Sequence, residues 1–304
     1  MQGENNNPKN RKKIMGNRAA TIVPTTTIAV TDWMDGPFNL PARQAEFAIG
    51  DVHGCTSQLE ALLSAGRRLA PGAHLTMLGD LIDRGPDSIG AIQTACAAVA
   101  NWEGGGTLLP GNHEALLMSC LQDEKSPHWV NLLRNGGEWA IDMIITENTD
   151  PAQALLRRLG EPAMNRLTQN GELMTKTAKG HMHRQSGNVI FVHAGVPMGE
   201  ADPIAWIESK NPLDVVNQHP LWIREGFFEH KAPFGNGMVV VHGHTPEHGI
   251  TRANGTTAKK GVCRVDRYRL GLDTGCFKTN IMSGAIIESG RYRIITATSN
   301  TTDT

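Results

Sequence analysis

The sequence lacks an apolar run long enough to span a bilayer, and it lacks an excess of either charge, since 29 basic and 30 acidic residues leave a formal net charge of −1. No overall field therefore points to a nucleic acid or a membrane as the partner. The five cysteines show no CxxC spacing, so neither a zinc knuckle nor a dithiol redox motif is expected. Scattered cysteines are typical of buried thiols in a reducing compartment, which predicts a cytoplasmic location.

The two ends of the chain show little apolar patterning. The stretch Thr21–Val30 is rich in threonine and broken by Pro24, and neither the apolar segment nor the cleavage site of a secretory signal is evident. We expect residues 1–44 to form a polar, mobile tail, residues 45–298 to form one domain, and residues 299–304 to form a short C-terminal tail. The basic cluster near the start is expected to be a solvated extension rather than a nucleic-acid arm.

Short apolar runs alternate with helical patterns, which is typical of an α/β fold. Leucines near helical spacing predict a helix over Ser57–Leu69, and Asp87 suits the cap of a second helix over Ile89–Val99. From about residue 115 to 188 helical patterns dominate, so a helical insertion is expected there. The predicted strands are Ala45–Ile49, His74–Leu78, Thr107–Leu109, Val189–Val192, Met238–Val241, Leu270–Leu272, Ala285–Ile287 and Tyr292–Ile295.

Five of these strands end, within one or two residues, at an aspartate, a histidine or an asparagine. Because ligands of α/β sheets bind at the carboxyl ends of strands, these polar side chains are expected to converge on one rim. Carboxylate, imidazole and amide oxygen together suit manganese, iron or zinc. Six ligands exceed what one catalytic ion with open positions needs, so the pattern predicts two divalent ions that share a carboxylate and activate a water molecule. The rim residues are Asp51, His53, Asp80, Asn112, His193 and His244.

Each rim residue also has a purely structural interpretation, because Asp and Asn after strands commonly form turns. Their joint occurrence at successive strand ends favours metal binding. Other polar and aromatic residues near the motifs do not share this pattern. Structural or packing roles are expected for His242, Asp273, Trp129, Trp139 and Trp222, and a solvated polar loop for His181, His183 and Arg184.

Three further side chains lie among the rim residues and suit phosphate chemistry. The guanidinium of Arg84 can hold two phosphate oxygens in a bidentate fork. Alkoxides are poor leaving groups, so a phosphoserine or phosphothreonine ester benefits from a proton donor, and His113 is the candidate. Asp83 can hold the imidazole of His113 and raise its pKa, as carboxylate partners do for histidine.

The strings around these residues resemble the signature motifs of the PPP-type metallophosphoesterases, the superfamily of serine/threonine protein phosphatases. The resemblance runs in the right order over about residues 46–297, and it is closest to the bacterial and phage branch that includes the phage lambda phosphatase. The matching strings are Gly50-Asp-Val-His-Gly54, Gly79-Asp-Leu-Ile-Asp-Arg-Gly85, Gly111-Asn-His-Glu114, Val192-His-Ala-Gly195, His242-Gly-His-Thr-Pro246, Asn135-Gly-Gly137 and Leu272-Asp-Thr-Gly275.

The resemblance implies a calcineurin-like fold, a four-layer α/β/β/α sandwich with the helical insertion. It implies a first metal on Asp51, His53 and Asp80, with Asp80 bridging to a second metal on Asn112, His193 and His244. It also implies that Arg84, Asn112 and Arg224 bind the phosphate, Arg224 by way of the Leu221–Arg224 segment, and that His113 is the acid, paired with Asp83. The expected ions are two Mn²⁺, with iron or zinc as alternatives.

The expected function is therefore metal-dependent hydrolysis of phosphate monoesters, with a metal-bridging hydroxide as the nucleophile. The expected substrates are phosphoproteins or phosphopeptides, on serine and threonine with tyrosine left open, and small phosphate esters in vitro. Neither a nucleic acid nor a membrane is an expected partner.

Two alternatives stay open. One is a symmetrical dinucleoside tetraphosphatase, a branch that often lacks the carboxylate of Asp83 and tends to have Asp in place of Glu114. The other is a catalytically inactive scaffold, which should have lost ligands, whereas none of the six is missing.

Overall fold

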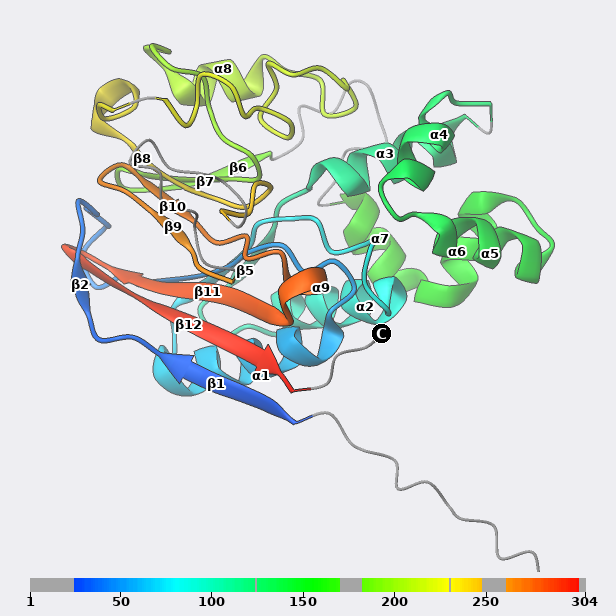
Figure 1. Ribbon diagram of the computed structural model, residues 1–304, viewed down its shortest axis with the longest axis horizontal. Helices are drawn as coiled ribbons and strands as arrows, with labels where there is room; N and C mark the ends of the chain where they lie inside the picture. The colour runs from blue at the N-terminus through cyan, green and yellow to red at the C-terminus, as the bar shows by residue number, and fades with distance from the viewer. Residues whose placement is uncertain (1–24, 124, 170–181, 230, 248–260, 301–304) are drawn as a thin grey trace, which may run out of the picture.

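Two β-sheets pack face to face, with helices against their outer faces (Figure 1). The structure is a computed structural model, which describes residues 25–123, 125–169, 182–229, 231–247 and 261–300. The predicted α/β/β/α sandwich with a helical insertion is confirmed. The helices are α1 (Thr56–Leu69), α2 (Ser88–Ala100), α3 (Asn112–Gln122), α4 (His128–Arg134), α5 (Glu138–Glu147), α6 (Pro151–Leu159), α7 (Glu161–Gln169), α8 (Pro203–Glu208) and α9 (Cys276–Thr279). Among the described helices, none has the length and apolar composition needed to cross a bilayer.

The larger sheet has the strand order β1-β12-β11-β3-β4-β5 over the described residues, with β2 beside β12. Strands β3, β4 and β5 are parallel, whereas β11, β12 and β1 continue the sheet in antiparallel pairs. The parallel part brings three strand carboxyl ends to the same edge. The strands are β1 (Thr26–Val30), β2 (Met34–Asp35), β3 (Glu46–Ile49), β4 (His74–Met77), β5 (Gly106–Leu108), β11 (Ile281–Glu288) and β12 (Arg291–Ser299).

The smaller sheet has the order β6-β7-β8-β10-β9. Its three central strands are parallel, so their carboxyl ends also meet at one edge. Strands β7 and β8 are buried throughout, which explains their continuous apolar sequences, because a strand covered on both faces has no polar side to alternate with. The strands are β6 (His183–Ser186), β7 (Val189–Val192), β8 (Val239–His242), β9 (Arg264–Val265) and β10 (Arg269–Gly271).

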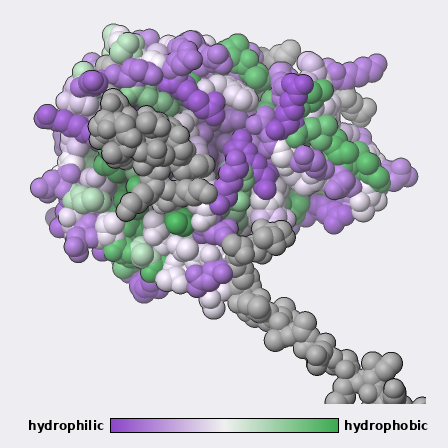
Figure 2. All heavy atoms as spheres, in the orientation of Figure 1, coloured by the Kyte–Doolittle hydropathy of each residue, from purple (hydrophilic) through white to green (hydrophobic). Residues whose placement is uncertain are grey.

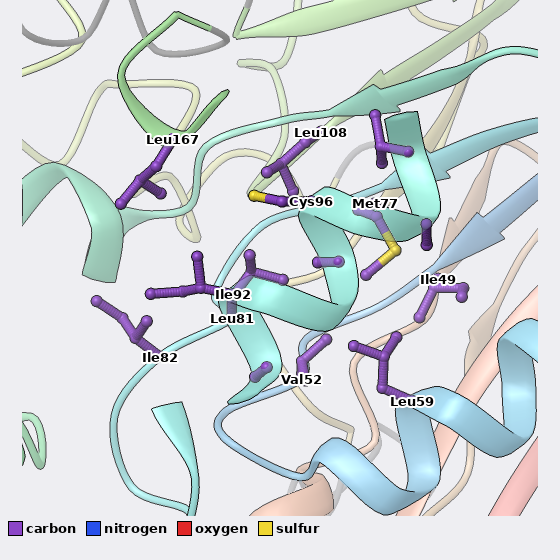
Figure 3. Packing of buried hydrophobic residues seen from close by; sticks show 14 of the residues in the cluster. Ile49, Val52, Leu59, Met77, Leu81, Ile82, Ile92, Cys96, Leu108 and Leu167 are labelled. Carbon is purple, nitrogen blue, oxygen red and sulfur yellow. The ribbon is translucent and has the colours of Figure 1, made fainter. Parts of the chain in front are cut away.

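Three hydrophobic clusters separate the four layers. The first lies between the larger sheet and its helices, where Leu59 of α1 and Ile92 of α2 pack with Ile49 and Met77 (Figure 3). The second fills the space between the sheets and includes Phe191. The third covers the outer face of the smaller sheet, and the members that α8 and the following loop contribute are Ile207, Leu221, Ile223, Phe227 and Phe234.

The predicted N-terminal boundary at residue 44 is wrong. Residues 1–24 lie outside the described residues, but Thr26–Val30 forms β1, which pairs with β12 from Thr26↔Ser299 to Val30↔Ile295. Phe38 and Leu40 are buried between the sheets. The β-branched residues of this segment favour a strand, but their mostly exposed faces gave no apolar alternation to detect. The sandwich also extends to Ser299 at its other end.

The helical insertion is shorter than predicted. It comprises α3 to α7, residues 170–181 lie outside the description, and strand β6 has begun by His183 (Figure 1). His183 and Arg184 therefore lie in a strand rather than in the predicted polar loop. Arg184 makes a bidentate ion pair with Glu46 at 2.6 and 3.0 Å, which links the smaller sheet to the larger one. The insertion exposes Val130 and Ile145, and Figure 2 shows such hydrophobic side chains on its surface, at the right of the view.

Candidate metal centre and active site

The carboxyl ends of the parallel strands of both sheets lead to the predicted rim residues. Strands β3 and β4 lead to Asp51 and Asp80, and β5 leads to Asn112 in the first turn of α3. Strands β7 and β8 lead to His193 and His244. All of them, and His53 too, are buried, with exposed fractions of 5% or less.

Asp80 lies at the centre of this cluster. Its Oδ2 atom is 3.7 Å from Nε2 of His53, and its Oδ1 atom is 3.4 Å from Nε2 of His193. Asp51 Oδ2 is 3.9 Å from the same atom of His53. The two oxygens of one carboxylate therefore face two separate groups of ligand atoms, as a carboxylate shared by two ions must.

The second group of ligand atoms surrounds Asn112. Its Oδ1 atom is 3.0 Å from Nε2 of His193 and 2.8 Å from Nδ1 of His244. His193 Nδ1 is 2.8 Å from the carbonyl oxygen of Leu78. Because a carbonyl only accepts, Nδ1 carries the proton and the Nε2 lone pair faces Asn112 and Asp80. A lone pair that faces oxygen atoms needs either a cation or a further proton between them. Burial alone would lower the pKa of His193, but Asp80 raises it above its usual value.

Histidine tautomers and unpaired atoms indicate that the cluster fits metal ions. His53 Nδ1 donates to the carbonyl oxygen of Ile82 at 2.8 Å, so Nε2 carries the lone pair that a metal ion would need, and here Arg84 Nη1 lies 3.1 Å from it. The buried Nε2 atom of His244 has no hydrogen-bond partner among the described residues, and buried polar atoms seldom lack one. Two groups of ligand atoms that lie within 4.8 Å of one another are formed by His53, Asp80 and His113 and by Asp80, His193 and His244.

The pKa values of the buried carboxylates and of His53 also indicate that the cluster fits metal ions. Burial, together with Asp273 and Asp80, raises the pKa of Asp51 well above its usual range. Burial alone would also raise the pKa of Asp80, but His193 and His113 hold it well below its usual range. A bound divalent cation stabilises such buried carboxylates in their ionised form. Burial lowers the pKa of His53 to about 3, so this imidazole is neutral and able to ligate a metal ion.

The backbone is left-handed at five site residues. The φ angles are positive at His53, Asp80, Asp83, Arg84 and His244. Each such non-glycine residue costs on the order of 1–3 kcal/mol and persists only where surrounding contacts fix it, which is common at functional sites. The site therefore depends on the contacts that hold these five residues in place.

Gly243 permits the close approach of two ligand loops. The backbone N–H of His244 donates to Asp51 Oδ1 at 2.9 Å. A Cβ atom on Gly243 would come within 2.1 Å of that same oxygen. Only glycine therefore lets the loop after β8 reach the carboxylate that follows β3.

Glu114 is a site residue that the sequence reasoning missed. Its Oε2 atom accepts the backbone N–H groups of Asp80 at 2.9 Å and of Gly111 at 2.8 Å, and Oε1 accepts that of Leu81 at 2.8 Å. Burial raises the pKa of Glu114 to about 7. Its position three residues after the helix N-cap was the available signal, because Glu at that position often binds the cap backbone.

Asp83 and His113 form a buried pair. Asp83 Oδ2 lies 2.6 Å from His113 Nδ1, and Asp83 Oδ1 accepts the indole N–H of Trp139 at 2.6 Å. Burial raises the pKa of Asp83 to about 7 and lowers the pKa of His113 to about 4, because it disfavours both charges. The prediction that Asp83 raises the pKa of His113 is therefore wrong. A protonated Asp83 that donates to Nδ1 leaves the proton of a neutral His113 on Nε2. That atom is 3.8 Å from Asp80 Oδ2.

Arg84 lies beside the ligand cluster. Its Nη1 atom is 3.1 Å from Nε2 of His53, and its Nη2 atom donates to Asn135 Oδ1 at 3.3 Å. Arg224 is exposed, donates through Nε to Thr245 Oγ1 at 3.2 Å, and interacts electrostatically with Asp80. Both guanidinium groups are therefore near the carboxylate that joins the two ligand groups.

A cavity of about 560 Å³ opens beside Arg84. Its walls include Phe277, whose ring centroid is 5.4 Å from that of His53 and 5.2 Å from the guanidinium carbon of Arg84. The start of α1 and the loop after Arg84 form the remaining walls, with Asp87 and Glu60 among them. Arg84 and Phe277 thus contact His53 and also line a space large enough for part of a substrate beyond its phosphate.

Two residues expected to be structural have buried polar contacts. Asp273 Oδ1 accepts the backbone N–H of Gly275 at 2.8 Å, and burial raises its pKa to about 6. His242 packs edge-on against Phe227, with ring centroids 4.9 Å apart. Neither residue belongs to the two groups of ligand atoms described above.

The chain is similar to several known proteins. The family model described as calcineurin-like phosphoesterase matches residues 47–275. Serine/threonine-protein phosphatase 1 of Salmonella typhimurium is 37% identical over 109 residues, which cover 36% of this chain and 46%, about half, of that relative. The asymmetrical bis(5'-nucleosyl)-tetraphosphatase PrpE of Oceanobacillus iheyensis is 25% identical over 244 residues, 75% of this chain and 82% of that protein. A cold-active protein-tyrosine phosphatase of a Shewanella species superposes with a TM-score of 0.47 at 15% identity, over 82% of this chain and 77% of that one.

Proposed function

Because the chain belongs to the calcineurin-like phosphoesterase family, which depends on two metal ions, we propose that it is a phosphatase of phosphoserine and phosphothreonine in proteins. The observation that carries this proposal is the Asp83–His113 pair, whose free Nε2 atom lies 3.8 Å from the central carboxylate of Asp80. A proton donor at this position serves a substrate with a strongly basic leaving group, such as an alkoxide.

In this proposal the two ions are held as the motif resemblance implies. Asp51, His53 and Asp80 would hold the first ion, and Asp80, Asn112, His193 and His244 would hold the second. When bound, such ions polarise phosphate oxygens and acidify a water molecule. The mixed oxygen and nitrogen ligands suit Mn²⁺, with Fe or Zn as alternatives.

The side chains of this chain then have separate tasks. Arg84 and Arg224 bind equatorial phosphate oxygens and offset their charge, and the amide of Asn112 adds a further contact. The oxygen of the attacking water forms a bond to phosphorus while the ester P–O bond breaks. His113 passes its Nε2 proton to the departing alkoxide, and the proton on Asp83 moves to Nδ1. The water loses its proton to solvent, so the products are inorganic phosphate and the free hydroxyl.

A dinucleoside tetraphosphatase, symmetrical or asymmetrical, is the second candidate, because relatives with both names match this chain and the asymmetrical PrpE matches more of it than the protein phosphatase does. Nucleotide leaving groups are weakly basic and need less help from an acid, so the Asp83–His113 pair favours the phosphatase. An inactive scaffold has no support in the geometry, because the six proposed ligands converge. The free cysteines support a cytoplasmic location, since four of the five are buried thiols.

The test compares substrates at saturating Mn²⁺. We expect a phosphoserine peptide to be hydrolysed with a higher kcat/KM than diadenosine tetraphosphate. His113→Asn should lower kcat for the peptide by about 10²–10⁴-fold, and less for an aryl phosphate with a good leaving group. Preferential cleavage of the dinucleotide would establish the second candidate instead. Turnover of both substrates no faster than in buffer with Mn²⁺ would support the catalytically inactive scaffold.

A further inference from the structure

The turn that carries Asp83 and Arg84 is held by a segment of the helical insertion. Both residues have left-handed backbones, with φ angles of 71° and 68°, which non-glycine residues adopt only where their surroundings fix them. The backbone N–H of Arg84 donates to the carbonyl oxygen of Gly136 at 3.2 Å. A Cβ atom on Gly136 would lie 2.8 Å from that nitrogen, so this approach requires glycine.

Asn135 fixes the side chain of Arg84. Its Oδ1 atom accepts from Arg84 Nη2 at 3.3 Å. Its Nδ2 atom donates to the carbonyl oxygen of Asn131 at 2.8 Å, which determines the side of the amide that faces Arg84. The guanidinium is thus directed by a residue at the end of α4.

Trp139 fixes the acid pair. Its indole N–H donates to Asp83 Oδ1 at 2.6 Å, while Asp83 Oδ2 contacts His113 Nδ1 at the same distance. Both oxygens of this carboxylate are therefore occupied, and the orientation of the imidazole depends on an indole 56 residues further along the chain. Trp139 also packs against the large hydrophobic core, so its ring has little freedom.

We infer that Asn135–Trp139, which comprises the loop from α4 to α5 and the start of α5, is a positioning element of the active site. Asn135 and Gly136 direct Arg84 toward the phosphate, and Trp139 directs the Asp83–His113 pair toward the leaving group. This inference rests on the proposed roles of Arg84 and His113. It makes the connection from α4 to α5 a support of the active site, because a shift of this segment changes phosphate binding and proton donation together.

Trp139→Phe tests the second half of the inference, since it removes the N–H donor and keeps an aromatic ring. The full-length protein with Mn²⁺ is assayed on a phosphoserine peptide and on an aryl phosphate with a good leaving group. We expect kcat for the peptide to fall about 10- to 100-fold and kcat for the aryl ester to change much less. Trp129→Phe is the matched control, because Trp129 packs against the same core from α4 and should leave both rates unchanged.

A double-mutant comparison separates positioning from a general loss of structure. In the His113→Asn background, Trp139→Phe should lower kcat for the peptide only a little further, because the imidazole that Trp139 positions is already absent. Two results would overturn the role of Trp139. One is an equal fall of kcat on both substrates, and the other is a fall of kcat in the double variant that equals the product of the two single effects. If His113→Asn itself shows no dependence on the leaving group, the proposed acid fails independently of Trp139.

Asn135→Ala tests the first half. We expect KM to rise about tenfold for both substrates while their kcat ratio stays constant, because phosphate binding is weakened and proton donation is not. Asn131→Ala is the control, since it leaves intact the backbone carbonyl that Asn135 binds. An unchanged KM in Asn135→Ala, or an equal rise of KM in Asn131→Ala, would overturn the claim that Asn135 directs Arg84 toward the phosphate.

Discussion

Glu114 accepts the backbone N–H of Asp80 at 2.9 Å, so a buried carboxylate holds the aspartate that faces both groups of ligand atoms. The other N–H donors to Glu114 belong to Leu81 and Gly111, which lie in two different ligand loops. The loops after β4 and β5 are therefore tied to one side chain in the first turn of α3.

Glu114→Gln should weaken metal binding. An amide offers one oxygen to three N–H donors and turns its own NH₂ group toward one of them, which leaves a buried donor unpaired at a cost of about 1–3 kcal/mol. Residues that support metal ligands typically contribute about 10–100-fold to affinity, and we expect a loss of that size for Mn²⁺ in a calorimetric titration. Glu161→Gln, in the first turn of α7, is the control for an exposed glutamate. Wild-type affinity in Glu114→Gln would contradict this role.

The ion pair between Glu46 and Arg184 should stabilise the sandwich rather than the reaction. Glu46 is fully buried and Arg184 is 15% exposed, so Glu46→Gln leaves a poorly solvated guanidinium. We expect the free energy of unfolding, from urea titration, to fall by up to about 3 kcal/mol. The double variant Glu46→Gln/Arg184→Met should recover most of this loss.

An exposed pair provides the comparison. Arg291 and Glu288 also form a 2.6 Å contact, but their side chains are 50% and 35% exposed. Glu288→Gln should therefore change the free energy of unfolding by less than about 1 kcal/mol. If Glu46→Gln and Glu288→Gln lower the free energy of unfolding equally, burial does not explain the contribution of Glu46 to stability.

His219 predicts a pH dependence of stability. It is fully buried, with Nε2 3.0 Å from the carbonyl oxygen of Asn211 and Nδ1 accepting the N–H of Leu221 at 3.2 Å, so the neutral ring satisfies both contacts. Burial lowers the pKa of His219 to about 4, whereas an unfolded histidine titrates near 6.5. The unfolded state binds the extra proton first, so this contribution to stability is complete above pH 6.5 and is lost as pH falls toward 4.

Comparison with His219→Gln isolates this contribution from other titrating groups. Glutamine can donate and accept at similar positions but does not titrate. Between pH 7 and 4.5 the wild-type protein should lose about 1–2 kcal/mol more stability than the variant, measured by urea unfolding. Parallel pH profiles for the two proteins would rule out His219 as the source.

The central strands and their polar ends could be predicted from the sequence because each signal is local. An apolar run such as Val189–Val192, followed by His193, carries both its strand and its proposed ligand in adjacent residues. The peripheral strands lacked this signal. Strand β6 reads His-Arg-Gln-Ser, and it is a strand because it pairs with β7 and because Arg184 reaches Glu46 in the other sheet.

The contacts that support the site could not be predicted, because they join distant segments. Nothing near Asp83 in sequence indicates Trp139, and the two meet only after α4 and α5 fold over the turn. Glu114 is similar, since the donors that it binds come from two loops. Sequence patterns therefore located the proposed ligands, whereas the residues that hold them required the folded structure.

The central claim is that Asp80 is shared by two ions, and anomalous diffraction at the manganese edge tests it most directly. A crystal of the protein grown with Mn²⁺ should show two anomalous peaks about 3.5–4 Å apart, one on each side of the Asp80 carboxylate. One peak should lie near Asp51 and His53, and the other near His193 and His244. A single peak, or peaks away from Asp80, would contradict the account.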